Sequence, residues 1–215
     1  MTKENCTHLT LVIDRSGSMQ SIREDAQGGI NTLVQDQAKV PGVITVSLYQ
    51  FDTEYEKVYG PINAVDAPTY NLNPRGGTAL LDSMGRAIND TGKFLRDLPE
   101  NERPNKVIFA VVTDGGENSS REYKLNTIKN MVEEQEGKYS WEFVYIGTNV
   151  NAFDEGMSMG MSTTVQYANT GASTRGAYAA FSSSLTDSRV YDSKISNTIA
   201  NDIDEEGNAT RSTSS

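Results

Sequence analysis

Two carboxylates and three hydroxyl groups occur in short, glycine-containing segments with the chemistry to bind a metal ion together. Asp14, Ser16 and Ser18 alternate in the first segment, Thr78 lies in the second, and Asp114 lies in the third. Carboxylate and hydroxyl oxygens are hard donors, which suit Mg²⁺, Mn²⁺ or Ca²⁺ better than zinc. Because only the two carboxylates are charged, a bound ion would keep excess positive charge and accept a further carboxylate. The residue types therefore predict a divalent-cation site.

The first and third segments follow the two strongest strand patterns in the chain. The apolar run 9–13 ends at Asp14, and the run 107–112 is followed by Thr113 and Asp114. The second run is apolar without alternation, which is typical of a strand buried on both faces. Ligands of parallel α/β sheets bind at the carboxyl ends of the strands, so both aspartates are predicted at that edge.

The other predicted elements alternate between helix and strand. Apolar residues spaced by three and four predict helices over 22–38, 80–95, 125–135 and 177–185. Strand patterns occur at 43–51, 55–59, 141–146 and 163–167, and a loop is predicted over 60–77. Strands that alternate with helices imply right-handed crossovers and helices on both faces of a sheet. We therefore predict an α/β fold with a mostly parallel sheet of about six strands, in which 55–59 is an antiparallel edge strand.

The residues of the predicted site also resemble the motifs of a known family. The stretch Asp14-Arg15-Ser16-Gly17-Ser18 matches the D-x-S-x-S motif of the von Willebrand factor type A domain. Gly76-Gly77-Thr78 and Thr113-Asp114-Gly115 resemble the two further motifs of that family, in the same order. The likeness covers about residues 7–190 and implies a three-layer, Rossmann-like fold with a complete metal-ion-dependent adhesion site.

The resemblance implies a role for each side chain of the site. Ser16 and Ser18 would bind the ion directly, and Asp14 would accept hydrogen bonds beside it. Thr78 and Asp114 would exchange direct for water-mediated contact as the domain switches between two states. A glutamate or aspartate from a protein partner would complete the coordination. The expected function is therefore a metal-dependent, adhesion-type binding module with Mg²⁺, Mn²⁺ or Ca²⁺ as its ion.

An enzyme is the second function class, and the motifs argue against it. A phosphatase of the haloacid dehalogenase type has an acid two residues after the strand-end aspartate, where this chain has Ser16. The only histidine, His8, precedes the first predicted strand, and the sequence contains no G-x-S-x-G, G-x-G-x-x-G or G-x-x-x-x-G-K motif. We expect no enzymatic activity.

A structural subunit of a larger bacterial or phage assembly is the third class, and in it the metal is secondary. The segment 191–215 is an acidic tail rich in Ser and Thr. Ile195, Ile199 and Ile203 recur every four residues, a spacing that allows a short docking helix before a disordered end. Treatment with a chelator distinguishes the adhesion-type module from the structural subunit. The module would lose its partner when the metal is removed, whereas the structural subunit would keep it.

Composition limits the partners and the cellular location. Lys and Arg number 19 against 29 Asp and Glu, giving a net charge of −10, and no basic cluster suited to nucleic acid occurs. No apolar run is long enough to cross a membrane, and residues 1–8 show no secretory signal. The single cysteine fits a reducing compartment. We expect synthesis in the cytoplasm, with a phage particle or another assembly as the alternative destination.

Three charged residues lie close to the predicted site in sequence. Asp52 and Glu117 are predicted as solvated loop acids rather than ligands. Arg15 lies inside the first motif, where it either contacts an acidic partner or is solvated. The loop over the 60s and 70s, Arg15 and the segment 115–121 are the expected recognition surface.

Sulfur and imidazole side chains are predicted to be structural. Cys6 and His8 are interpreted as a partly packed thiol and an exposed ring, because the chain has no second cysteine or histidine to form a metal pair. Met157, Met159 and Met161 alternate with Ser and Gly and are predicted to pack a loop rather than bind a soft metal.

Overall fold

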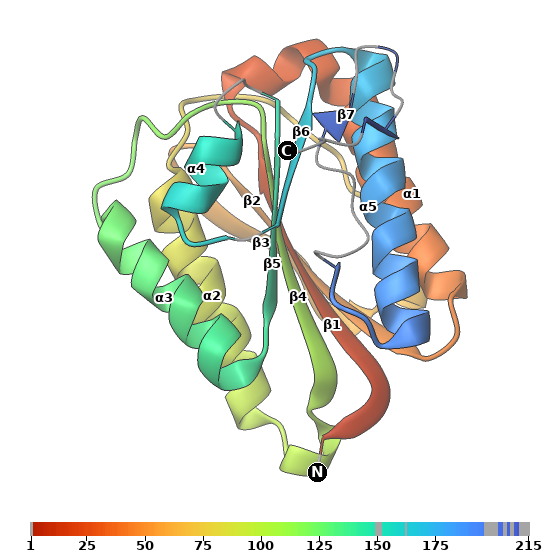
Figure 1. Cartoon of the computed structure of the whole chain (residues 1–215). Helices are drawn as coiled ribbons and strands as arrows, with labels where there is room; N and C mark the ends of the chain where they lie inside the picture. The colour runs from red at the N-terminus through yellow and green to blue at the C-terminus, as the bar shows by residue number, and fades with distance from the viewer. Residues whose placement is uncertain are drawn as a thin grey trace, which may run out of the picture.

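The middle layer of the protein is a single sheet. The computed structural model describes residues 2–148, 152–161, 163–195, 202–203, 206 and 209–210. The strands lie in the order β3-β2-β1-β4-β5-β6-β7-β8 (Figure 1). They are β1 (Lys3–Asp14), β2 (Val43–Phe51), β3 (Tyr55–Asn63), β4 (Pro104–Thr113), β5 (Glu142–Gly147), β6 (Thr163–Tyr167), β7 (Asp202–Ile203) and β8 (Ala209–Thr210).

The pairing of the strands confirms the predicted sheet. β1 pairs in parallel with both β2 and β4, β4 pairs in parallel with β5, and β5 with β6. β3 is antiparallel to β2 and forms one edge. Beyond these six strands, the two-residue strands β7 and β8 form a short antiparallel pair at the other edge, which the sequence patterns did not predict.

Helices cover both faces of the sheet. In Figure 1, α1 (Arg23–Lys39) and α5 (Gly171–Tyr191) lie on one face, and α2 (Leu80–Asp97) and α3 (Leu125–Tyr139) lie on the other. A short helix, α4 (Ala152–Ser158), packs against β5 and β6. The three-layer, Rossmann-like α/β prediction is therefore confirmed, and α4 is an addition to it.

The central strands have an apolar core on each side. Leu11 and Ile13 of β1 face the core beneath α1 and α5, whereas Val12 faces the core beneath α2 and α3. The same alternation continues in β4, where Val112 and Val111 belong to opposite cores. Because both faces of these strands are buried, the segments 11–13 of β1 and 107–112 of β4 are apolar without alternation.

Some elements are longer than predicted. β1 begins at Lys3 rather than near Leu9, and Lys3 N donates to Arg103 O at 2.7 Å beside the start of β4. β3 continues to Asn63 where a loop was predicted. α5 begins at Gly171, because the hydroxyl of Thr170 accepts a hydrogen bond from Ser173 N and caps the helix.

The C-terminal segment differs from the expected helix where it is described. Ile195 is 1% exposed and packs into the core beneath α1 and α5. Ile203 lies in the strand β7, so a helix from Ile195 through Ile203 is wrong at its far end. Ile199 and most of the predicted disordered end lie outside the described residues.

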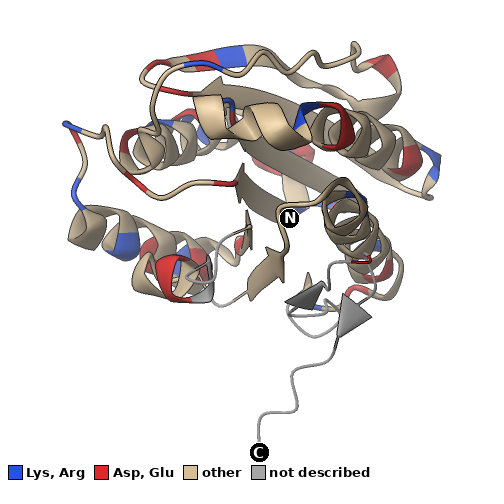
Figure 2. Cartoon of the chain, turned by 90° about the horizontal axis from the view of Figure 1, so that it is seen from above, with Lys and Arg blue, Asp and Glu red and all other residues tan. Residues whose placement is uncertain are grey.

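Charged residues lie mainly on the helices and loops that surround the sheet, with acidic and basic side chains interspersed (Figure 2). None of the helices in the described part of the chain is both long enough and apolar enough to cross a membrane.

Candidate metal centre

The ends of β1 and β4 bring the two predicted aspartates to the same edge of the sheet. Ile13 pairs with Val112 in the parallel register of these strands, so Asp14 lies beside Thr113. Asp114 follows one residue later, where the chain leaves β4. The carboxyl edge of the sheet is where parallel α/β folds place their ligands.

Asp14 is fully buried and is held by two neighbours. Its Oδ1 accepts a hydrogen bond from Ser16 N at 2.6 Å, and its Oδ2 accepts one from Thr113 Oγ1 at 2.6 Å. Burial raises the pKa of Asp14 to about 6, although these hydrogen bonds oppose the rise. The carboxylate therefore fixes the turn that carries the serines and links it to the end of β4.

The two serine hydroxyls and Asp114 form a chain of closely spaced oxygens. Ser16 Oγ lies 3.0 Å from Ser18 Oγ, and Ser18 Oγ donates to Asp114 Oδ1 at 2.6 Å. Adjacent ligands of an octahedral ion with bonds of about 2.1 Å lie about 3.0 Å apart. The distance between the two serine hydroxyls fits neighbouring positions around a Mg²⁺-sized ion, and the hydrogen bond from Ser18 holds Asp114 beside them.

Thr78 joins this group from the loop before α2. Its side chain is buried, and a Cβ built on Gly115 would lie 3.6 Å from Thr78 Oγ1 and 3.4 Å from Ser18 Oγ. The backbone at Gly115 thus passes beside both hydroxyls, which lie within ordinary van der Waals contact of the Cβ position. All five predicted side chains are therefore brought together at this edge.

The second oxygen of Asp114 lacks a partner. Oδ2 is buried and makes no hydrogen bond within the described part of the chain. Burial raises the pKa of Asp114, and the hydrogen bond from Ser18 opposes this. A buried carboxylate oxygen without a partner is costly, whereas a cation beside it would favour the ionised form. The donor set therefore fits a hard divalent ion.

Backbone hydrogen bonds tie the three loops to one another. Gly17 N donates to Gly76 O at 3.2 Å, and Asn118 N donates to Thr78 O at 3.0 Å. The side chain of Asn118 returns the contact, because its Oδ1 accepts from Thr78 N at 2.9 Å. The positions of the hydroxyls and carboxylates are thus fixed by the loops themselves.

Arg15 and Asp52 are buried together. Asp52 was predicted to be solvated, and Arg15 was predicted either to contact an acidic partner or to be solvated. Arg15 Nε donates to Asp52 Oδ2 at 3.0 Å, and Arg75 Nε donates to the same oxygen at 2.7 Å. Asp52 is 1% exposed, so its prediction as a solvated acid is wrong. Burial opposes ionisation of Asp52, but hydrogen bonds from the Arg75 side chain and Glu54 N, together with the charges of both arginines, outweigh it and lower the pKa. Arg15 therefore braces the loop and is removed from the expected recognition surface.

Glu117 is exposed, but it is not merely solvated. Its carboxylate accepts hydrogen bonds from Leu81 N, Ser119 N and Ser120 N. It therefore fastens the loop after β4 to the first turn of α2. The sequence analysis did not predict this role of Glu117. It also did not predict that the hydroxyl of Thr113 contacts Asp14, although Thr113 directly precedes the predicted ligand Asp114.

The imidazole and sulfur side chains are packed in the interior. His8 is 0% exposed, so the predicted exposed ring is wrong; its Nδ1 lies 2.8 Å from Thr45 Oγ1. The central position of β1 buries this ring. Cys6 is also buried. Met159 and Met161 pack in the core beneath α2 and α3, as predicted, whereas Met157 lies in α4 and is 47% exposed, so the packing predicted for it is wrong.

Within the described residues, no group of three or more His, Cys, Asp or Glu side chains is arranged to hold a metal ion. The centre at the sheet edge contains two carboxylates and depends on hydroxyl oxygens for its remaining donors. This composition suits Mg²⁺ or Mn²⁺ rather than a metal that selects imidazole or thiolate.

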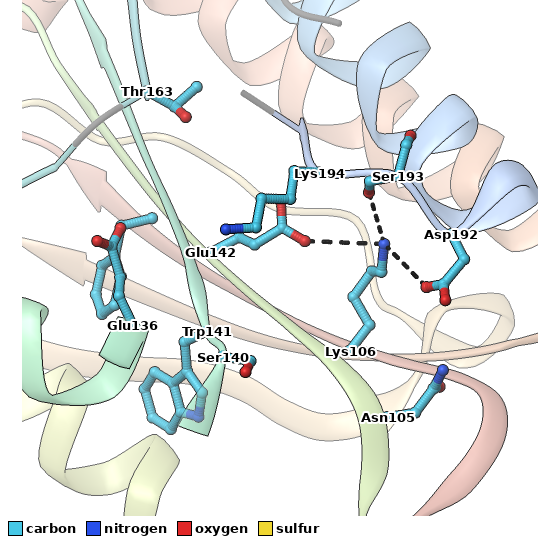
Figure 3. A pocket seen from close by; sticks show the side chains of 11 residues that line it. Asn105, Lys106, Glu136, Ser140, Trp141, Glu142, Thr163, Asp192, Ser193 and Lys194 are labelled. Carbon is cyan, nitrogen blue, oxygen red and sulfur yellow. Dashed lines mark hydrogen bonds and ion pairs between the residues drawn. The ribbon is translucent and has the colours of Figure 1, made fainter. Parts of the chain in front are cut away.

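A cavity of about 260 Å³ lies near the amino ends of β4 and β5, away from the metal centre (Figure 3). Lys106 Nζ donates to Ser188 O and Ser193 O, both at 2.8 Å, and lies 3.8 Å from Glu142 Oε1 and 3.6 Å from Asp192 Oδ1. These contacts join the end of α5 to the starts of β4 and β5. The lysine therefore has a structural role in fastening the last helix to the sheet.

Comparison with known proteins gives a clear result for the fold. No protein-family model and no curated protein sequence matches the chain. A solved structure of a von Willebrand factor type A protein from Catenulispora acidiphila matches with a TM-score of 0.61 and 15% identity, over 86% of this chain and 43% of that chain. Proximal thread matrix protein 1 from the mussel byssus, with a zinc-occupied MIDAS motif, matches with a TM-score of 0.54 and 16% identity, over 74% and 41% of the two chains. The manganese-loaded TRAP protein of Plasmodium vivax matches with a TM-score of 0.54 and 16% identity, over 76% and 69%.

These matches define the class of the protein by its fold. The chain has the von Willebrand factor type A fold, and it carries hydroxyl and carboxylate side chains at the carboxyl edge of the sheet. It spans less than half the length of the Catenulispora and mussel chains. At identities of 15–16%, the likeness concerns the fold alone.

Proposed function

We propose that this chain is a divalent-cation-dependent protein-binding module. Ser16, Ser18, Thr78 and Asp114 would hold the ion, and Asp14 would orient Ser16 and Thr113 beside it. The observation that carries the proposal is the convergence of these side chains around Asp114, whose Oδ2 is buried without a partner in the described part of the chain. Ser18 is exposed, so an ion at this place is within reach of a partner carboxylate.

Mg²⁺, Mn²⁺ or Ca²⁺ is the proposed ion, and a partner Asp or Glu is the proposed ligand from outside. Two solved proteins of the same fold hold a metal, one with a zinc-occupied MIDAS motif and one loaded with manganese, and this supports a metal for this chain. An ion held by few charged donors keeps positive charge, which favours a carboxylate from a second protein.

We further propose that the site binds without catalysis. The only histidine and the only cysteine of the chain lie within β1, buried away from its Asp14 end. Neither is placed to activate a hydroxyl of Ser16, Ser18 or Thr78 as a nucleophile, and the carboxylate that accepts from Ser18, that of Asp114, would be engaged by the proposed ion.

Titration calorimetry of Mg²⁺ and Mn²⁺ into EDTA-treated protein tests the metal site. Asp114→Asn keeps the size of the side chain and removes its charge, and Asp36→Asn is the matched control on the exposed surface of α1. We expect saturable binding by the wild type and by Asp36→Asn, and none by Asp114→Asn. Equal binding by all three proteins would refute the assignment of Asp114 as a ligand.

A partner pull-down with and without EDTA tests the second half of the proposal. Loss of an acidic partner in EDTA and in Asp114→Asn supports a carboxylate bridge. Retention of the partner in both would favour a structural subunit of an assembly, and the bridge would then be wrong.

A further inference from the structure

A groove lies at the end of α2 farthest from the metal centre. It has a volume of about 510 Å³ and runs between the last turns of α2 and the end of α3. Trp141, which directly precedes β5, lies in its lining together with Val107 of β4. The groove is separate from the metal centre, and it shares Trp141 with the cavity of Figure 3.

The inner surface of the groove is apolar. Trp141 is 5% exposed and stacks on Phe143 with 6.1 Å between ring centroids, and Ile88 of α2 is buried beside it. Tyr139 at the end of α3 is 61% exposed at the rim. A Cβ built on Gly92 would meet only the Trp141 ring, at 4.0 Å, so no side chain of α2 fills this part of the groove. The space therefore suits a large apolar side chain from outside.

The rim of the groove is basic, although the protein is acidic. Lys93, Arg96 and Arg103 line it, and none of its described lining residues is Asp or Glu. The chain as a whole has 29 acidic and 19 basic residues. Neither Lys93 nor Arg96 forms an ion pair within the described residues. Arg103 is fixed by hydrogen bonds to Arg96 O and Leu98 O, and its charge is partly balanced by Glu100, so Lys93 and Arg96 are the rim cations left for a ligand. This separation of charge favours an acidic ligand.

We propose that the groove between α2 and α3 binds an acidic segment of a partner protein that inserts a large apolar side chain against Trp141. The carboxylates of the segment would pair with Lys93 and Arg96 at the rim. Burial of the inserted apolar side chain against Trp141 would supply affinity. The basic residues at the rim would favour a negatively charged segment over a neutral or basic one. This binding requires no metal, so it is independent of the function proposed for the sheet edge.

The probe is a short synthetic peptide of alternating Glu and Asp around a central Phe. Trp141 is the only tryptophan of the chain, so intrinsic fluorescence of the full-length protein reports on the groove. The titration is made in EDTA, because peptide carboxylates would otherwise also reach the metal centre. We expect a saturable change in emission, about tenfold weaker binding when Ser replaces Phe, and no binding when Lys replaces the acids.

Gly92 offers a matched pair of variants that leave every charge in place. Gly92→Leu puts a side chain into the groove, whereas Gly92→Ala adds only a methyl group at a distance the structure tolerates. Both replace a helical glycine and should not lower stability. We expect Gly92→Leu to weaken the peptide by at least about tenfold and Gly92→Ala to retain it.

Reversal of charge tests the rim separately. Lys93→Glu is compared with Lys124→Glu, an exposed lysine outside the groove. We expect about fivefold weaker binding for the first and unchanged binding for the second.

Three results would overturn the proposal. The first is no saturable change in emission up to about 1 mM peptide, the weak end of specific binding. The second is equal affinity of Gly92→Leu and Gly92→Ala. The third is self-association of the protein that Gly92→Leu abolishes, which would assign the groove to a second copy of this chain instead.

Discussion

At the scale of single residues, the side chain of Asp114 has two features that are energetically unfavourable when no metal ion is bound. Its Oδ2 is buried without a partner in the described part of the chain, and its charge also raises the pKa of the neighbouring Asp14. Sites that bind ligands commonly contain groups that are unfavourable without the ligand. The proposed cation would relieve both features by supplying positive charge beside the two carboxylates.

We therefore predict opposite effects of Asp114→Asn in the absence and presence of metal. In EDTA the variant should be more stable than the wild type by about 1 kcal/mol, because one buried charge is removed. With excess Mg²⁺ the order should reverse, since only the wild type gains from binding. Urea denaturation in the two buffers measures both values, and a loss of stability in EDTA would contradict the argument.

His8 is a second residue whose burial has a measurable effect. Burial lowers the pKa of the ring to about 3, with a smaller contribution from the charge of Lys57. The unfolded chain takes up the proton near pH 6.5, whereas the folded protein does not, so acid favours unfolding between these values. The stability contributed by the neutral ring is complete above pH 6.5 and falls as the pH is lowered toward 3.

Between pH 7 and pH 5, the wild type should lose about 2 kcal/mol more stability than His8→Gln. The free energy of unfolding from urea titrations in EDTA gives the comparison, because the contributions of the carboxylates are shared by both proteins. Parallel pH profiles would show that the ring is protonated in the folded protein.

At the scale of elements, the contact between α1 and α5 distinguishes two adjacent glycines. A Cβ on Gly28 would meet no atom within 4 Å, whereas a Cβ on Gly29 would lie 2.4 Å from Tyr178 Cδ2. Tyr178 is 2% exposed, and its ring and Cβ lie against the Gly29 position. Gly29 is thus required for the close approach of the two helices, and Gly28 is not.

Gly28→Ala should stabilise the protein by about 0.5–1 kcal/mol, because alanine is the better helix former. Gly29→Ala should destabilise it by about 1–3 kcal/mol, because the added methyl group overpacks the interface. Thermal melts of the two variants provide the test, and each is the control for the other. Equal shifts of the two melting temperatures would mean that α5 moves away from α1 without penalty.

The elements themselves could largely be predicted, because their patterns are local. The apolar runs of β1 and β4 and the helical spacing in α2 identify the layers without knowledge of any contact. The first residues of β1 were missed, because they are polar and pair with the start of β4 through Lys3 and Arg103. The strand β3 was predicted too short for a similar reason, since its last residues pair with β2 rather than show an apolar pattern of their own.

At the scale of the whole molecule, the candidate centre could be predicted only in part. Its acids lie at strand ends, and parallel strands bring those ends to one edge whatever the details of packing. The environment of Arg15 could not be predicted, because Asp52 reaches it from another strand end. The same holds for Thr113, whose contact with Asp14 depends on the register between β1 and β4.

This dependence on the whole fold leads to the last prediction, which concerns metal removal. The proposed ligands come from three loops that are separated by long stretches of sequence, so an unfolded chain offers no preformed site. Binding to the native state alone stabilises a protein by about 2.7 kcal/mol at a ligand concentration of one hundred times Kd. For a domain of this size, that corresponds to a rise in Tm of about 5–10 °C. We therefore expect Mg²⁺ to raise the melting temperature and EDTA to reverse the rise.

Two controls make the measurement specific to the centre. Asp36→Asn should show the same rise as the wild type, and Ser18→Ala should show a smaller one, because Ser18 lies between Ser16 and Asp114 in the chain of oxygens. A rise that persists unchanged in Asp114→Asn would place the metal elsewhere on the acidic surface. A rise confined to proteins with an intact centre would show that the ion links the three loops, and that folding of the whole sheet is what creates its binding site.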